Sequence, residues 1–216
     1  MTLRYSYGKP SHTDRRTPNQ MTPAVMSQGM DTYNFRNTYP DNRSIVLAVA
    51  AHGPNLRGVE LGLYQANSFC TMLQVCTNVD ELIGVDKWEP YVDKVGGGEM
   101  VRDQKQIEFI RNTAINFIYW SGCADRATIL EVDTIEAAKR YEDGTMDFVF
   151  FDAHLSQQQL IDEMTAWYPK IKQGGLVMGH DYEARETRHA VLEFRLDNKI
   201  ETPYFNYDDT FIWKKE

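Results

Sequence analysis

The sequence has few cysteines, no long apolar run and no apolar block at its N-terminus. Its 216 residues include only Cys70, Cys76 and Cys123, and none of them forms a CxxC pair. This odd number argues against a disulfide framework and predicts buried free thiols in a reducing compartment. Because neither a membrane-length apolar stretch nor a secretory signal is visible, we expect a cytoplasmic protein without a membrane partner.

Basic charge is also scarce, and it is unevenly spread. The formal net charge is −8, and residues 1–43 carry +3, so the remainder carries −11. An acidic body argues against a nucleic-acid partner. Residues 1–43 are rich in Thr, Pro, Asn, Ser and Arg without periodicity, which predicts an irregular arm. Residues 44–216 are long enough for a single α/β domain.

Short apolar runs alternate with segments of helical spacing along this domain. Strands are expected at residues 57–62, 82–86, 128–132, 148–151 and 176–178, with a terminal hairpin at 202–207 and 210–213. Helices are expected at 44–51, 67–79, 99–119, 133–141, from 156 until a stop at Gly174-Gly175, and at 184–197, with a loop around Pro90 and residues 96–98. The alternation predicts a Rossmann-like, doubly wound sheet that is mainly parallel and has a C-terminal antiparallel hairpin strand.

The fourth expected strand, residues 148–151, is the most apolar and stops at Asp152 and His154. A run of this kind suits a central strand that is covered on both faces. Ligands of open α/β sheets bind outside the carboxyl ends of the strands. We therefore expect Asp152 and His154 at a functional edge, with a simple polar strand end as the alternative.

Acids recur at the ends of the other expected strands. Glu60, Asp86 and Asp133 lie at or directly after the first three strands, and His180-Asp181 follows the fifth. Such an edge suits a nucleoside cofactor, because an acid after the second strand can accept both ribose hydroxyls. The first turn contains only Gly62 instead of GxGxxG, so a cofactor without a pyrophosphate, such as S-adenosylmethionine (SAM), is favoured.

The first turn follows the pattern E-[VI]-G-x-[YFW]-x-G-x-S at Glu60, Gly62, Tyr64 and Ser68, with Ala66 at the second glycine. Together with DFVFFDAH and AWYPKIKQGGLVMGHDY between residues 147 and 182, it resembles the class I SAM-dependent methyltransferases, specifically the Methyltransf_24 group and related sugar or macrolide O-methyltransferases. The resemblance covers residues 55–195. It implies cofactor binding by these four residues, by Asp86 at the ribose, by Asp133 near the adenine, and by Lys87 and Asp152.

The resemblance also implies a metal site. In metal-dependent members, an acid after the fourth strand and a pair after the fifth hold Mg²⁺, which binds two adjacent substrate hydroxyls. The matching residues are Asp152, His180 and Asp181. Since Mg²⁺ prefers oxygen ligands, a His180 that faces away is one alternative. A metal-free edge, in which Asp181 only caps its loop, is another.

Methyl transfer also requires removal of a proton from the acceptor. We predict His154 as the base, because histidine titrates near neutral pH. In similar enzymes the base lies three residues after the acid, where this sequence has Leu155. His180, or a metal that lowers the pKa of the hydroxyl, is therefore an open alternative.

These observations predict a SAM-dependent O-methyltransferase for a small hydroxylated acceptor, such as a sugar. One alternative is a degenerate methyltransferase fold that serves as an interaction module. Another is a nicotinamide-dependent oxidoreductase, which an all-parallel sheet of six strands would favour. A terminal antiparallel strand inserted between the fifth and fourth strands would instead favour the methyltransferase. Oligomeric state is open, with a homo-oligomer as one option.

Overall fold

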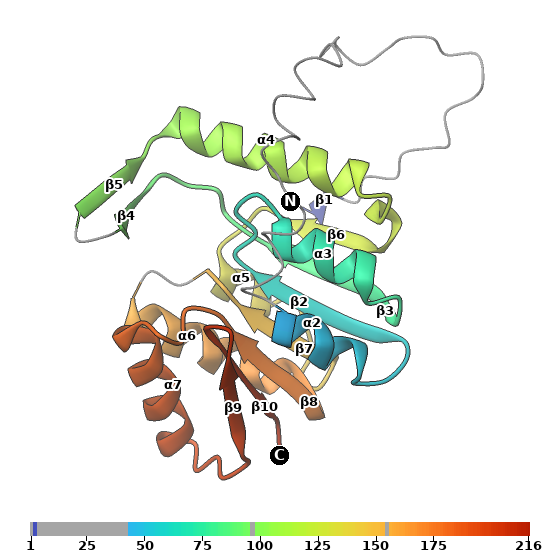
Figure 1. Cartoon of the computed structure of the whole chain (residues 1–216), viewed down its shortest axis with the longest axis vertical. Helices are drawn as coiled ribbons and strands as arrows, with labels where there is room; N and C mark the ends of the chain where they lie inside the picture. Colours follow the sequence, from blue (N-terminus) through green and yellow to red (C-terminus); the bar gives the residue numbers. More distant parts are fainter. Residues whose placement is uncertain (1, 4–42, 96–97, 154–155) are drawn as a thin grey trace.

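A computed structural model describes residues 2–3, 43–95, 98–153 and 156–216 (Figure 1). The strands are β1 (Thr2–Leu3), β2 (Leu56–Leu61), β3 (Val79–Val85), β4 (Tyr91–Val95), β5 (Gly98–Arg102), β6 (Ala127–Leu130), β7 (Met146–Phe151), β8 (Ile171–Gly179), β9 (Tyr204–Tyr207) and β10 (Thr210–Lys214). The helices are α2 (Arg43–Ala50), α3 (Asn67–Val75), α4 (Gln104–Trp120), α5 (Thr134–Ala138), α6 (Gln157–Trp167) and α7 (Arg185–Asp197), with short 3₁₀ turns at Ala124–Arg126 and Tyr168–Lys170.

Eight strands form one sheet in the order β1-β6-β3-β2-β7-β8-β10-β9. The five strands from β6 to β8 are parallel, whereas β1, β10 and β9 pair antiparallel with their neighbours. This confirms the predicted doubly wound, mainly parallel sheet with a C-terminal antiparallel hairpin. The pair β1–β6 is an addition, because residues 1–43 were expected to be irregular. The rest of that arm, residues 4–42, lies outside the described residues.

Successive side chains of β7 point to opposite faces of the sheet and so into two different hydrophobic cores, because side chains alternate along a strand. Phe148 and Phe150 pack with residues of α2, α3 and α4. Val149 and Phe151 pack with residues of α5, α6 and α7 on the opposite face. Figure 1 shows these two layers of helices on either side of the sheet. The central position of β7 therefore confirms the interpretation of its apolar run, and its carboxyl end lies in the middle of the functional edge.

The terminal strand does not lie between the fourth and fifth predicted strands, the position that would have favoured a methyltransferase over an oxidoreductase. β7 and β8 pair directly with each other, from Met146–Ile171 to Phe151–Gly179, so no strand lies between them. β10 pairs with the outer edge of β8, and β9 lies beyond it. The two-residue turn at Asp208 and Asp209, both with positive φ, explains this position, because it keeps β9 directly beside β10.

The region between β3 and β6 contains a second correction. Residues 91–95 and 98–102, which were expected to be loop and the first turn of a helix, instead form the antiparallel pair β4–β5, a separate two-stranded sheet. Gly96 and Gly97 of the expected loop lie outside the described residues. α4 begins only after Asp103, whose carboxylate accepts the Gln106 N–H while the Gln106 amide oxygen accepts the Asp103 N–H. This reciprocal capping box fixes the start of the helix.

Two helix ends also differ from expectation. α3 ends at Val75 and β3 begins at Val79, because Val79 is fully buried and continues the strand. α6 ends at Trp167, and Pro169 lies in the short turn that follows. Ile171, expected on the helix, and Gly174-Gly175, expected to stop it, are part of β8.

The prediction of buried free thiols is confirmed for Cys70, Cys76 and Cys123. None of the helices in the described ranges combines the length and the hydropathy that crossing a bilayer requires.

Candidate active site

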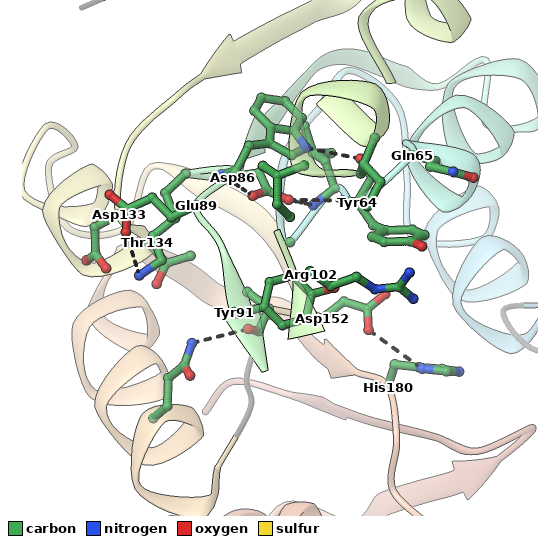
Figure 2. Close-up of a pocket in the computed structure, with 18 of the residues that line it drawn as sticks. Tyr64, Gln65, Asp86, Glu89, Tyr91, Arg102, Asp133, Thr134, Asp152 and His180 are labelled. Carbon is green, nitrogen blue, oxygen red and sulfur yellow. Dashed lines mark hydrogen bonds and ion pairs between the residues drawn. The ribbon is translucent and has the colours of Figure 1, made fainter. Parts of the chain in front are cut away.

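A cavity of about 740 Å³ opens at the carboxyl ends of the parallel strands, where the sequence places most of its candidate residues (Figure 2). Its volume lies in the range typical of small-molecule and cofactor sites. The predicted residues on its wall are Gly62, Tyr64, Ser68, Asp86, Lys87, Asp133, Asp152, His180 and Asp181. They converge because the strands that precede them are parallel neighbours, so their carboxyl ends meet at one edge of the sheet.

The turn after β2 forms one wall of the cavity. Gly62 has φ +85°, and a Cβ atom there would lie 2.4 Å from the Asp152 carbonyl oxygen and 2.6 Å from the Ala153 Cα atom. Only glycine allows this close approach of the β2 and β7 ends. Tyr64 and Ala66 also have positive φ, 48° and 62°, although neither is glycine. The second glycine of the pattern is thus replaced by an alanine that adopts the left-handed conformation.

Asp86 holds this turn from the end of β3. Its Oδ2 atom accepts the backbone N–H groups of Leu63 and Tyr64 at 2.9 and 3.0 Å, and its Oδ1 atom accepts that of Trp88 at 2.8 Å. Burial raises the pKa of Asp86, and the three hydrogen bonds oppose this shift. The carboxylate therefore organises the turn directly, in addition to the ribose contact predicted for it.

Two residues of the first-turn pattern differ from expectation. Glu60 does not line the cavity: it is fully buried, and its Oε1 atom accepts the hydroxyl hydrogen bond of Ser68. Burial raises the pKa of Glu60 well above its ordinary value. The side chains of Asn67 and Ser68 are of the kind that can cap a helix, but the N-cap of α3 is Ala66 and no side chain caps the helix there. The Ser68 hydroxyl is directed to Glu60 instead, because an isolated buried carboxyl needs a donor.

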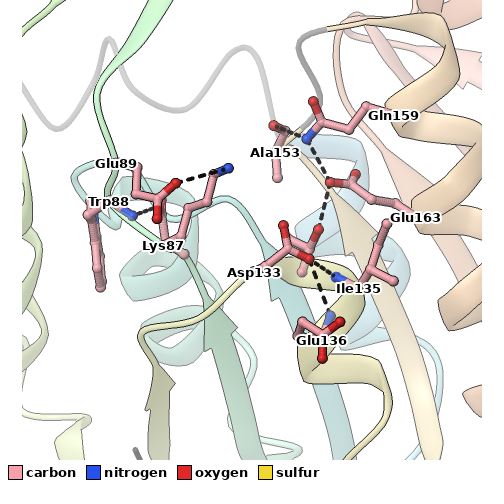
Figure 3. Close-up of polar contacts among 11 residues, drawn as sticks. Lys87, Trp88, Glu89, Asp133, Ile135, Glu136, Ala153, Gln159 and Glu163 are labelled. Carbon is pink, nitrogen blue, oxygen red and sulfur yellow. Dashed lines mark hydrogen bonds and ion pairs between the residues drawn. The ribbon is translucent and has the colours of Figure 1, made fainter.

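Asp133 is the N-cap of α5. Its Oδ1 atom accepts the N–H groups of Ile135 and Glu136, and the side chain remains on the cavity wall (Figure 3). Lys87 lies on the same wall and pairs with Glu89 at 3.3 Å. Their roles toward a cofactor stay predictions.

The three predicted metal ligands form a cluster. One potential ligand atom from each of Asp152, His180 and Asp181 lies within 4.8 Å of the others. The Nδ1 atom of His180 lies 3.6 Å from Asp152 Oδ1 and 3.1 Å from Asp181 Oδ1. His180 therefore faces the two acids and does not face away, and its buried Nε2 atom has no hydrogen-bond partner among the described residues.

Electrostatics in this cluster favour bound positive charge. Burial raises the pKa of Asp152 to about 8, with Asp181 and Asp209 adding to the shift and His180 opposing it. Burial lowers the pKa of His180, but the Asp181 hydrogen bond and the charge of Asp152 outweigh it and raise the value to about 9. Two carboxylates and an imidazole at this spacing fit the donor set of a divalent cation.

The predicted base, His154, lies outside the described residues, so its role is untested. Sequence reasoning also missed cavity residues, among them Trp88, Tyr91, Arg102, Thr134 and Gln159. Trp88 follows Asp86 closely enough to have been included. Arg102 had no signal, because the strand pair that positions it was expected to be loop and helix.

A family model described as a methyltransferase domain, Methyltransf_24, matches residues 59–182, more than half of the chain. The chain belongs to this methyltransferase family. Its members are class I SAM-dependent enzymes, so the family implies SAM as the methyl donor. The nicotinamide-dependent oxidoreductase is therefore set aside. The comparison with curated proteins gave no match.

Solved structures support the same fold for this methyltransferase. The O-methyltransferase NovP is similar with a TM-score of 0.60 at 20% identity, over 82% of this chain and 79% of that chain. A methyltransferase from Geobacter sulfurreducens is similar with a TM-score of 0.59 at 13% identity, over 93% of this chain and 92% of that chain. A precorrin-6y C5,15-methyltransferase from Geobacter metallireducens is similar with a TM-score of 0.56 at 14% identity, over 81% of this chain and 88% of that chain. At these identities the likeness shows the fold, and the acceptor needs a separate argument.

Proposed function

We propose that this methyltransferase transfers the methyl group of SAM to a hydroxyl oxygen of a small acceptor, such as a sugar, with a divalent cation held by Asp152, His180 and Asp181. The observation that carries the proposal is the convergence of this cluster and the Asp86-held turn on one cavity. The cluster of Asp152, His180 and Asp181 suits a polyhydroxylated acceptor, and the turn held by Asp86 suits a nucleoside.

The residues of the cavity divide into two groups by position. Gly62, Tyr64, Asp86 and Asp133 lie on the β2, β3 and β6 side, where they would hold the nucleoside part of SAM. Asp152, His180 and Asp181 follow β7 and β8, where they would orient the acceptor. Methyl transfer needs acceptor oxygen, methyl carbon and sulfur in line, so fixing both partners against one rigid sheet edge lowers the barrier.

A divalent cation at the cluster supplies a Lewis acid that lowers the pKa of a hydroxyl group. The two carboxylates and the Nδ1 atom of His180, which faces them, give the chain the donors to bind it. We retain His154 as the proposed proton acceptor from the sequence, with His180 as the alternative.

Two calorimetric titrations test the proposal without requiring the acceptor. The protein should bind SAM, and in its presence it should bind Mn²⁺, as a stand-in for Mg²⁺. Asp152→Asn should weaken Mn²⁺ binding by at least tenfold, since it removes one charged ligand from the cluster. Asp197→Asn, at an exposed acid on α7, is the matched control and should bind Mn²⁺ normally.

The possible results separate the parts of the proposal. Folded protein that gives no heat with SAM would support the interaction module and overturn the enzyme. If the protein binds SAM but wild type and Asp152→Asn bind Mn²⁺ with identical affinity, the proposed methyltransferase is retained. The proposed cation site at the cluster is then wrong.

A further inference from the structure

The β4–β5 pair, which is separate from the main sheet, brings the guanidinium group of Arg102 to the cavity. Tyr91 and Arg102 are register partners at the base of this pair, and both line the cavity. Figure 2 shows them among the same side chains as Tyr64, Asp152 and His180. The antiparallel pairing, which ends immediately before the capped start of α4, fixes the backbone position of Arg102.

Arg102 has unused hydrogen-bonding capacity. Its Nε atom is buried and has no hydrogen-bond partner among the described residues. The guanidinium carbon lies 5.9 Å from the centre of the Tyr64 ring, a cation–π contact that leaves the N–H groups available. A buried N–H group without an acceptor costs free energy, so a ligand that supplies an acceptor would gain affinity here.

The other charges of the cavity show which ligand group this must be. The acids on the wall are Asp86, Glu89, Asp133, Asp152 and Asp181. The other cationic side chains there have acid partners already, since Lys87 pairs with Glu89 and His180 contacts Asp152 and Asp181. An anionic group entering the cavity would meet repulsion almost everywhere except at Arg102.

SAM carries one such group, the carboxylate of its methionine part. We infer that Arg102 binds this carboxylate, with the Tyr64 ring supporting the guanidinium plane. The planar guanidinium offers two parallel N–H donors that match a carboxylate. This inference rests on the proposed use of SAM, and it makes the β4–β5 pair part of the cofactor site.

The test compares SAM with decarboxylated SAM, which lacks only this carboxylate. Calorimetry should show that the wild-type protein prefers SAM by about 10- to 100-fold, the range expected for charge-assisted hydrogen bonds. Arg102→Met should lose this preference because its affinity for SAM falls, while its affinity for decarboxylated SAM changes less than about threefold. Arg102→Lys should retain part of it, because the charge remains and the paired donors do not. Lys105→Met, at an exposed position on α4 outside the cavity wall, should behave as wild type.

Each contrary result is distinct. If Arg102→Met weakens both ligands equally, Arg102 only holds the β4–β5 pair in place, and the inference is wrong. An undiminished preference for SAM in Arg102→Met also overturns it, although the proposed function stands. Wild-type protein that binds neither ligand overturns the proposed function itself.

Discussion

Asp86 stabilises a strained turn that would otherwise oppose folding. Tyr64 and Ala66 adopt left-handed backbone conformations, which cost of order 1–2 kcal/mol for residues with a side chain. The hydrogen bonds from Leu63, Tyr64 and Trp88 to the Asp86 carboxylate offset this cost. The same side chain therefore fixes the turn and lies on the cavity wall, so its two effects have to be measured separately.

Asp86→Ala should lower SAM affinity more than tenfold and the free energy of unfolding by about 2–4 kcal/mol, because the backbone N–H groups of Leu63, Tyr64 and Trp88 lose a charged acceptor. Asp86→Asn keeps one acceptor oxygen, so its SAM affinity and its free energy of unfolding should fall less than those of Asp86→Ala. Calorimetry and urea unfolding measure the two quantities. A normal SAM affinity in Asp86→Ala would remove Asp86 from the cofactor site.

Sequence reasoning located the candidate site well where the fold itself gathers residues. Residues such as Asp86, Asp133 and Asp152 follow parallel strands, and the shared edge of the sheet brings them together whatever the loops do. Glu60 lies inside its strand, so its direction depends on the register with the neighbouring strands, which no local pattern reveals. Arg102 depends on an added strand pair, and its position could not be inferred either.

At the scale of elements, the buried strands were predictable and the β4–β5 pair was not. A continuous apolar run such as Phe148–Phe151 has few alternatives to a central strand. The segment Tyr91–Arg102 contains no comparable run, and its three glycines favour a turn. The capping box at Asp103 and Gln106 is the signal that could have shown that the helix starts only after this segment.

The pairing of β8 with β10 depends on a glycine opposite a phenylalanine. Gly179 and Phe211 are register partners, and a Cβ atom at Gly179 would lie 2.1 Å from the Phe211 ring. Gly179→Ala should therefore lower the free energy of unfolding by about 1–3 kcal/mol through overpacking. Urea unfolding of Gly179→Ala, Phe211→Leu and the double variant measures the effect.

The double variant decides the cause of that loss. A smaller ring-free side chain at residue 211 should relieve the clash, so the double variant should be more stable than the sum of the single changes predicts. Additive losses would mean that Gly179 matters for another reason.

At the scale of the whole molecule, a buried polar chain joins the helical layer of α5 and α6 to the cavity. The Oε1 atom of Glu163 accepts hydrogen bonds from Thr134 Oγ1 at 2.9 Å and Gln159 Nε2 at 3.0 Å, and Gln159 also donates to the Ala153 carbonyl (Figure 3). Trp167 donates to the Thr134 carbonyl. Thr134 and Gln159 both line the cavity, so the chain couples its wall to the core.

Glu163 should make the stability of the whole domain depend on pH. Burial raises the pKa of this fully buried carboxyl from 4.5 to about 7, while its hydrogen bonds with Gln159 and Thr134 oppose the shift. Between these values the folded protein holds a proton that the unfolded chain releases. The group therefore lowers the free energy of unfolding as pH rises from about 5 to about 8, by up to about 3 kcal/mol.

Glu163→Gln should remove this loss, because the amide keeps an acceptor for Thr134 and Gln159 and does not titrate. Urea unfolding at pH 5 and pH 8 should show that the variant gains stability relative to wild type at the higher pH. Glu142→Gln, at an exposed position, makes the same change of charge and should leave the pH dependence unaltered. If wild type and Glu163→Gln lose equal stability between the two pH values, Glu163 is ionised without penalty in the folded protein. The polar chain would then have to contain a further donor, and its two hydrogen bonds would not account for the buried charge.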